Sequence, residues 1–251
     1  MGKVSVKTLK LAISFLTTIP FPSIGLVSDE EMSRTVAFFP LVGLIVGGVN
    51  LAVYLLGLSF WSPVVAAWLW LITNAIVTGG LHLDGWIDTF DALGSRKSRS
   101  EMLVIMKDSR IGAMGGIAAV LLIGLKWSLL VESSAVPVLV FLAPMIGRSA
   151  VLIATQTFVY IREKGLGHAF TQPLNLNLWI FALSIVFIPL LILTDIAGLL
   201  AALTAVILSI LWAWILSRKF GGLTGDNYGA LNEIAEVLFL LFTLAKFGRL
   251  L

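Results

Sequence analysis

Apolar residues occur along this chain in long unbroken stretches, not in the alternation of apolar and polar residues that membrane β-barrel strands show. A helix needs about 20 consecutive apolar residues to cross a bilayer. The stretches predict about seven transmembrane helices. They lie at residues 35–59, 61–83, 111–131, 135–160, 176–194, 196–216 and 234–251.

A shorter apolar stretch covers residues 9–22 and ends in Ile19-Pro20-Phe21-Pro22. Lysines precede it, as in a signal peptide, but no small-residue cleavage site follows. We expect an interfacial or re-entrant segment that stays in the mature protein.

Composition supports this interpretation. Of 251 residues, 59% are hydrophobic and 12% are charged, whereas soluble domains carry about 25% charged residues. This composition excludes a soluble enzyme, a disordered chain and a basic nucleic-acid-binding domain. The net charge is only +3, so the excess of basic residues does not imply a nucleic-acid partner. The absence of cysteine excludes disulfides, thiol nucleophiles and cysteine-based metal sites. We expect an all-α, polytopic integral membrane bundle, surrounded by lipid and forming one domain over residues 1–251, with no nucleic-acid partner.

The connections between the predicted helices are of two kinds. Those near 60–62, 132–136 and 195 are tight and contain no Lys or Arg. The long polar segments at 23–34, 84–110, 162–175 and 217–233, together with the N-terminus, hold most of the 17 basic residues. The positive-inside rule places these segments in the cytoplasm, so we expect an inner-membrane protein with its active site on that side. Lys246 and Arg249 would then lie outside, which counts against this topology.

An acidic cluster begins at the end of the second predicted helix. Asp84, Asp88 and Asp91 fall within roughly 60° on one helical face, where like charges repel. Cations between them would relieve the repulsion, and oxygen-only ligands suit Mg²⁺, Mn²⁺ or Ca²⁺. The alternative is a solvated helix end. His82 lies on another face, either as a ligand or as an interfacial histidine.

The same loop continues with Lys107-Asp108-Ser109-Arg110 before the next apolar stretch. Asp108 adds a fourth carboxylate, and its two basic neighbours suit a phosphate. The alternative is that these cations only flank the membrane, as we expect of the basic residues at 96–99.

A third polar cluster, residues 220–233, is rich in glycine, which lets backbone N–H groups approach an anion closely. A flexible turn is the alternative. Asp226 and Glu233 would share a face of a helix here. Lys126 and Arg148 lie inside apolar stretches, where a charge needs a partner or a role unless it snorkels to the interface.

Three of these blocks, at 79–91, 106–112 and 221–226, resemble the adenosylcobinamide-GDP ribazoletransferase family, also called cobalamin 5′-phosphate synthases. Segments 15–20, 143–148 and 165–167 fit as well, in the same order. Ala92 stands where the family pattern has glycine, a change that removes no ligand.

The resemblance implies an inner-membrane enzyme of vitamin B12 synthesis. Such an enzyme joins adenosylcobinamide-GDP to α-ribazole or its 5′-phosphate, releases GMP and requires Mg²⁺. The family is distantly similar to CDP-alcohol phosphotransferases, and a phospholipid synthase of that kind is the first alternative, although its full motif is missing. A secondary transporter is the second, although its acids would lie near mid-membrane.

The resemblance also gives the site residues their expected roles. Transfer of a phosphoryl group depends on charge neutralisation and positioning. We expect Asp84, Asp88 and Asp91 to hold Mg²⁺, with Asp108 or Asp226 completing the metal shell. Asp108 or Asp226 would accept the proton of the attacking hydroxyl. Phosphate binding is expected from Lys107, Arg110, Arg148, Gly222 and Thr224.

Overall fold

The computed structural model describes residues 5–21, 25–162 and 166–245, and every regular element there is a helix. The α-helices are α1 (Val6–Leu16), α2 (Asp29–Thr35), α3 (Phe39–Phe60), α4 (Pro63–Thr78), α5 (Leu81–Gly94), α6 (Arg99–Ile105), α7 (Ala113–Glu132), α8 (Val138–Thr157), α9 (Leu166–Ala169), α10 (Leu176–Leu193), α11 (Ile196–Phe220) and α12 (Gly225–Leu244). Short 3₁₀ turns cover Val36–Phe38 and Ser133–Ala135. The all-α prediction is confirmed.

Five helical segments of the described chain are long and apolar enough to cross a membrane, and up to six if a bent pair counts as one span. The five are Asp29–Phe60, Ala113–Ala135, Val138–Thr157, Leu176–Leu193 and Ile196–Phe220. They confirm a polytopic helical membrane protein and five of the expected stretches, and within the described residues the count is five, or six with the bent pair.

The stretch predicted at 61–83 is broken into α4 and α5, which meet at 91°. Gly79 and Gly80 form the break, with φ of +62° and +71°. Glycine adopts this left-handed backbone without strain, so it ends α4 and starts α5 in a new direction. The acidic block therefore stands on a short helix of its own.

The stretch predicted at 234–251 also differs from the structure. α12 begins earlier, at Gly225, and buries Asn232, Glu233 and Glu236, so it does not qualify as a span by composition. Residues 246–251, with Lys246 and Arg249, lie outside the described residues.

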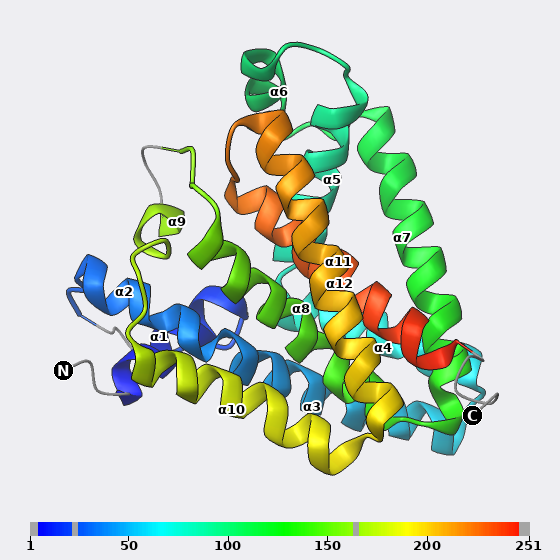
Figure 1. Cartoon of the computed structure of the whole chain (residues 1–251). Helices are drawn as coiled ribbons and strands as arrows, with labels where there is room; N and C mark the ends of the chain where they lie inside the picture. The colour runs from blue at the N-terminus through cyan, green and yellow to red at the C-terminus, as the bar shows by residue number, and fades with distance from the viewer. Residues whose placement is uncertain (1–4, 22–24, 163–165, 246–251) are drawn as a thin grey trace.

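α8 and α12 form the centre of the bundle (Figure 1). α8 packs against α3 on one side and α12 on the other, and α12 also contacts α5 and α11. The tight connections lie along the lower part of Figure 1, and the long polar segments lie at the top and left. The predicted division into two kinds of connection is therefore confirmed.

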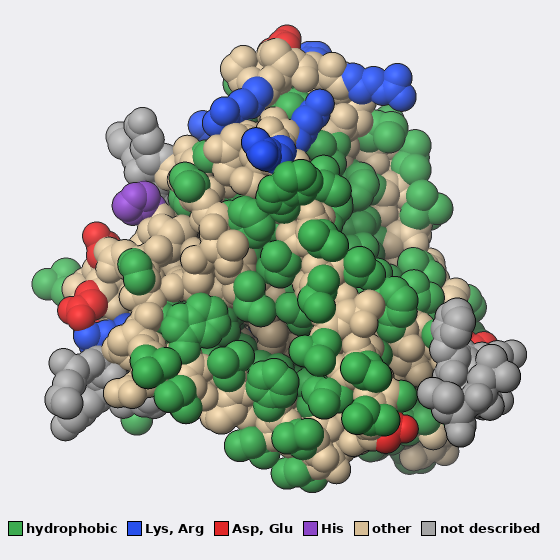
Figure 2. Space-filling model, in the orientation of Figure 1, with side chains coloured by type: hydrophobic (Ala, Val, Ile, Leu, Met, Phe, Trp, Pro, Cys, Tyr) green, Lys and Arg blue, Asp and Glu red, His purple; other side chains and the backbone are tan. Residues whose placement is uncertain are grey.

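Figure 2 shows apolar side chains over most of the visible body, with Lys and Arg gathered at the top over α6 and the end of α11. Large apolar residues on the long helices are more than half exposed, among them Val120, Ile192 and Ile207. Such a surface is too apolar for water and suits lipid.

The N-terminal helix α1 has 11 residues and is too short to cross a bilayer. Beyond it, the Thr18 backbone N–H donates to the Val77 carbonyl at 2.7 Å, which ties the segment to the end of α4. The short, non-spanning character expected of this segment is confirmed, and its place relative to the lipid stays a prediction.

Candidate functional site

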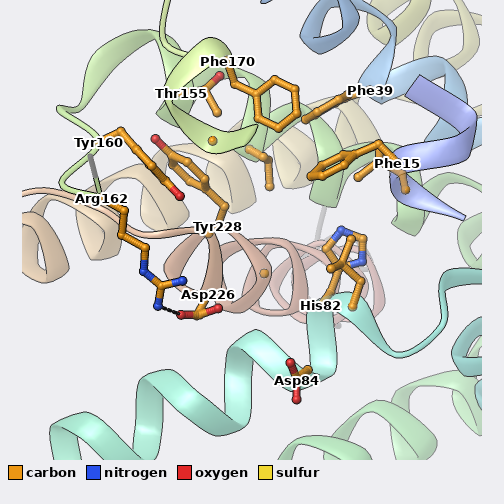
Figure 3. A pocket seen from close by; sticks show the side chains of 16 residues that line it. Phe15, Phe39, His82, Asp84, Thr155, Tyr160, Arg162, Phe170, Asp226 and Tyr228 are labelled. Atoms are coloured by element: carbon orange, nitrogen blue, oxygen red, sulfur yellow. Dashed lines mark hydrogen bonds and ion pairs between the residues drawn. The ribbon is translucent and has the colours of Figure 1, made fainter. Parts of the chain in front are cut away.

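A cavity of about 310 Å³ lies where α5 and α12 meet α1, α3, α8 and the chain after α8 (Figure 3). Its polar side is formed by His82, Asp84, Arg162 and Asp226, and the opposite side is aromatic. The cavity thus brings together charged side chains that are far apart in the sequence.

Asp84 and Asp226 come close because α5 and α12 touch through their backbones. A Cβ on Gly85 would lie 2.6 Å from the Asp226 carbonyl oxygen, and one on Gly229 would lie 3.2 Å from the Gly85 Cα. Only glycine allows this approach. The glycines in both blocks therefore bring the two acidic helix starts together.

Arg162 reaches Asp226 from the chain that follows α8. Its Nη2 lies 2.6 Å from the Asp226 Oδ2. The preceding residues are held in place because the Ile161 N–H donates to the Leu223 carbonyl at 3.0 Å and the Leu223 N–H donates to the Val159 carbonyl at 2.8 Å. In the sequence, Arg162 is only one of several basic residues in a polar segment, and no local pattern marks its partner.

Gly222 and Thr224, expected to bind phosphate, do not line the cavity. A Cβ on Gly222 would lie 2.2 Å from the Ile161 Cγ2, so this glycine is needed for contact between segments. The fully buried Thr224 hydroxyl caps α12 by accepting the Asn227 N–H at 3.2 Å. Both residues build the loop before α12.

Asp91 shares the face predicted for the acidic stripe, but its carboxylate is occupied. Its Oδ2 accepts the Gly112 N–H and its Oδ1 accepts the Gly115 N–H, each at 2.7 Å. A Cβ on either glycine would lie 2.4 Å from that carboxylate. Asp91 therefore caps the N-terminus of α7, where the helix dipole favours a negative charge. This contact leaves Asp84 and Asp88 as the stripe members available to a ligand.

Asp88 is half-buried one turn beyond Asp84 on α5. Three carboxylates lie close enough to repel its negative charge, namely Asp84, Asp226 and Asp91. Arg162 is the cation close enough to attract it. Neither Asp84 nor Asp88 takes part in an ion pair within the described chain.

The donor set fits a hard cation, since carboxylate oxygens suit Mg²⁺ and excess negative charge favours its binding. Among the residues that the structure describes, no three His, Asp or Glu side chains already converge on one metal position. A cation would therefore have to draw the side chains together.

Asp108 is not placed with the other acids. It lies on the loop between α6 and α7, where Arg110 holds it at 2.6 Å from Nη2 to Oδ2. This guanidinium lowers the pKa of Asp108 to about 2. Lys107 and Arg110 are exposed beside it and do not line the cavity. The structure therefore does not place these three residues at the cavity.

Arg148 lies in the interior of the bundle. Its Nη1 donates to the Pro144 carbonyl at 3.0 Å and pairs with Glu236 at 3.1 Å. Lys126 Nζ lies 2.6 Å from Glu233 and 2.6 Å from Glu236. Lys126 and Arg148 thus have buried partners on α12 and do not snorkel. The expected phosphate contact of Arg148 is not supported, because the residue is 1% exposed and does not line the cavity.

Comparison with known proteins decides the family. The family model described as cobalamin-5-phosphate synthase matches residues 8–244. The chain belongs to this family.

Several curated cobalamin-5-phosphate synthase relatives carry the name adenosylcobinamide-GDP ribazoletransferase. The protein of Desulfitobacterium hafniense (strain Y51) is 39% identical over 245 residues, covering 94% of this chain and 96% of its own. That of Brevibacillus brevis (strain 47 / JCM 6285 / NBRC 100599) is 41% identical, covering 92% and 94%. That of Klebsiella pneumoniae (strain 342) is 36% identical, covering 94% and 98%. No solved structure matches.

Proposed function

We propose that this protein joins adenosylcobinamide-GDP to α-ribazole or its 5′-phosphate and releases GMP, which completes the assembly of cobalamin or its 5′-phosphate. Family membership and near full-length relatives with this activity in their names support the assignment. The observation that carries it is the polar side of the cavity, where Asp84, Asp226 and Arg162 meet.

In this reaction a ribose hydroxyl of the acceptor attacks the phosphorus that is bonded to cobinamide. The new P–O bond forms as the bond to the GMP oxygen breaks, and the hydroxyl proton must leave. Such transfers need in-line positioning and charge neutralisation more than covalent help from the protein. Here the Arg162 guanidinium, and a cation held by the carboxylates, would supply the charge neutralisation.

We assign Mg²⁺ binding to Asp84 and Asp88, which have no ion pair within the described chain. When bound, Mg²⁺ neutralises charge on the diphosphate and on the departing GMP. Asp91 is left out of this set because both its carboxylate oxygens cap α7, and Asp108 because it does not line the cavity.

Asp226 is our candidate for accepting the hydroxyl proton, because it lines the cavity and Asp108 does not. Arg162 holds Asp226 at 2.6 Å and has further N–H groups that suit a phosphate. These two residues therefore act together at the start of α12.

The site belongs on the cytoplasmic side of the inner membrane in this proposal. Lys and Arg side chains gather at the top of Figure 2, over α6 and the end of α11, and the positive-inside rule makes that end cytoplasmic. Both substrates are large polar molecules of the cytoplasm, which agrees with this orientation.

The test uses the full-length protein in detergent with adenosylcobinamide-GDP, α-ribazole 5′-phosphate and Mg²⁺, and measures GMP. We expect GMP release that stops with EDTA and returns when Mg²⁺ is added. Absence of GMP in complete buffer would contradict the proposed reaction. Full turnover in metal-free buffer would contradict only the metal assignment.

A further inference from the structure

The side of the cavity opposite Asp84 and Asp226 is built from aromatic rings (Figure 3). Phe170 packs edge-on against Phe15 at 4.9 Å and against Phe39 at 5.5 Å between ring centroids. Tyr160 and Tyr228 stack at 6.1 Å with 17° between their planes. Such walls offer π-faces to a flat ring, which is how proteins commonly bind bases.

Tyr228 gives this aromatic side a polar group without a partner. The residue is 6% exposed and lines the cavity, yet its hydroxyl makes no hydrogen bond within the described chain. Buried hydroxyl groups nearly always have a partner. An aromatic wall with one unpaired hydroxyl fits a flat heterocycle that has one hydrogen-bonding atom.

We propose that this aromatic side binds the heteroaromatic base of the acceptor nucleoside, stacked on Phe170, with the Tyr228 hydroxyl donating to its ring nitrogen. The inference rests on the proposed function and names the acceptor's place within it. Because Asp84, Asp226 and Tyr228 line the same cavity, a base on the aromatic side leaves the ribose facing the carboxylates.

The acceptor base fits this place better than either part of the donor does. The base of ribazole is a methylated benzimidazole with one free ring nitrogen, so a mostly apolar wall satisfies it. Guanine carries several donors and acceptors along its edge, and leaving these unpaired would weaken binding. The corrin macrocycle is far too large for a cavity of about 310 Å³, which is near the lower limit for small-molecule sites.

The test measures binding of α-ribazole alone, and separately of GDP, to the full-length protein in detergent by calorimetry. Tyr228→Phe removes one oxygen, and we expect α-ribazole to bind about three- to tenfold more weakly. Phe170→Leu removes a stacking ring, with an expected loss of about tenfold or more. GDP affinity should stay unchanged in both variants.

Tyr54→Phe is the matched control. The Tyr54 hydroxyl donates to the Leu130 carbonyl, away from the cavity, so α-ribazole affinity should not change. Weaker GDP binding with normal α-ribazole binding in Tyr228→Phe would overturn the proposal and assign the site to guanine. Unchanged affinity for both probes would also overturn it. Failure of the proposed function is separate, because it would appear as α-ribazole binding by the wild type without GMP release.

Discussion

The middle and the start of α12 hold charged side chains in different ways. In the middle, Glu233 and Glu236 face Lys126 and Arg148, and each anion has a cation within 2.6 Å. All four side chains are at most 6% exposed. The charges of this interior network therefore balance inside the protein.

At the start of the same helix the charges do not balance. Asp226 has Arg162 at 2.6 Å, but Asp84 and Asp88 bring further carboxylates that have no ion pair in the described residues. These side chains also border a cavity or lie one turn from it. The excess negative charge beside the cavity favours binding of a cation, and a bound cation would in turn favour a phosphate substrate.

One helix thus carries charged side chains that hold the fold together in its middle and charged side chains that are available to a ligand at its start. Both groups looked similar in the sequence, since each places ionisable residues in or next to apolar stretches. A balanced buried network contributes little net stability relative to apolar packing, but removing one member leaves an unpaired charge and is costly. An unbalanced group loses little stability when one charge is removed, and its loss appears in activity.

The largest expected effect on stability comes from Glu236→Gln. This change leaves Lys126 and Arg148 with only Glu233 as an anion, so the free energy of unfolding should fall by about 3–5 kcal/mol. Thermal unfolding in detergent measures it. Glu30→Gln, in an exposed pair with Arg34, is the control and should change stability by less than about 1 kcal/mol. Equal, small losses of stability in both variants would contradict the claim that removing a charge from the buried network is costly.

A smaller loss is expected from Gly112→Ala. The new Cβ would lie 2.4 Å from the Asp91 carboxylate, so the cap of α7 must move, at a cost of about 1–3 kcal/mol in unfolding free energy. Gly124→Ala, also on α7, meets nothing within 4 Å and is the control. If chemical denaturation gives both variants the same stability, the close approach of Gly112 to the Asp91 carboxylate does not stabilise the fold.

The smallest effect is expected from Asp108→Asn. Because Arg110 lowers the pKa of Asp108 to about 2, the contribution of this pair is complete above about pH 5 and is lost as the pH falls towards 2. Between pH 5 and 8 the unfolding free energy of the wild type should therefore show no titration of Asp108. GMP release by the Asp108→Asn variant should stay near normal. A loss of turnover by orders of magnitude would instead restore Asp108 to the catalytic set.

Much of the fold follows from local sequence. Long apolar stretches located the five candidate spans, and helical periodicity put Asp84, Asp88 and Asp91 on one face. The break between α4 and α5 was missed because a double glycine permits a left-handed turn without requiring one.

Most of the site depends on contacts between distant segments, which no local pattern encodes. Arg162 and Asp226 are 64 residues apart, and Asp91 and Gly112 are 21 apart. The same holds for Arg148, whose partner Glu236 lies 88 residues away. The sequence showed that a charged residue within an apolar stretch needs a partner. It did not show which residue the partner is, and therefore not whether the charged residue has a structural or a functional role.

The most direct test of the account compares Asp84→Asn with Asp195→Asn in the GMP-release assay. Asp84 borders the cavity without an ion pair in the described chain, whereas Asp195 caps α11 through a contact with the Gly198 N–H that asparagine can keep. We predict that Asp84→Asn lowers kcat by about a thousandfold with unchanged thermal stability, since several kcal/mol of transition-state stabilisation depend on the bound metal. Asp195→Asn should retain normal kcat. Near-normal turnover of a folded Asp84→Asn variant would contradict the assignment of the unbalanced carboxylates to catalysis.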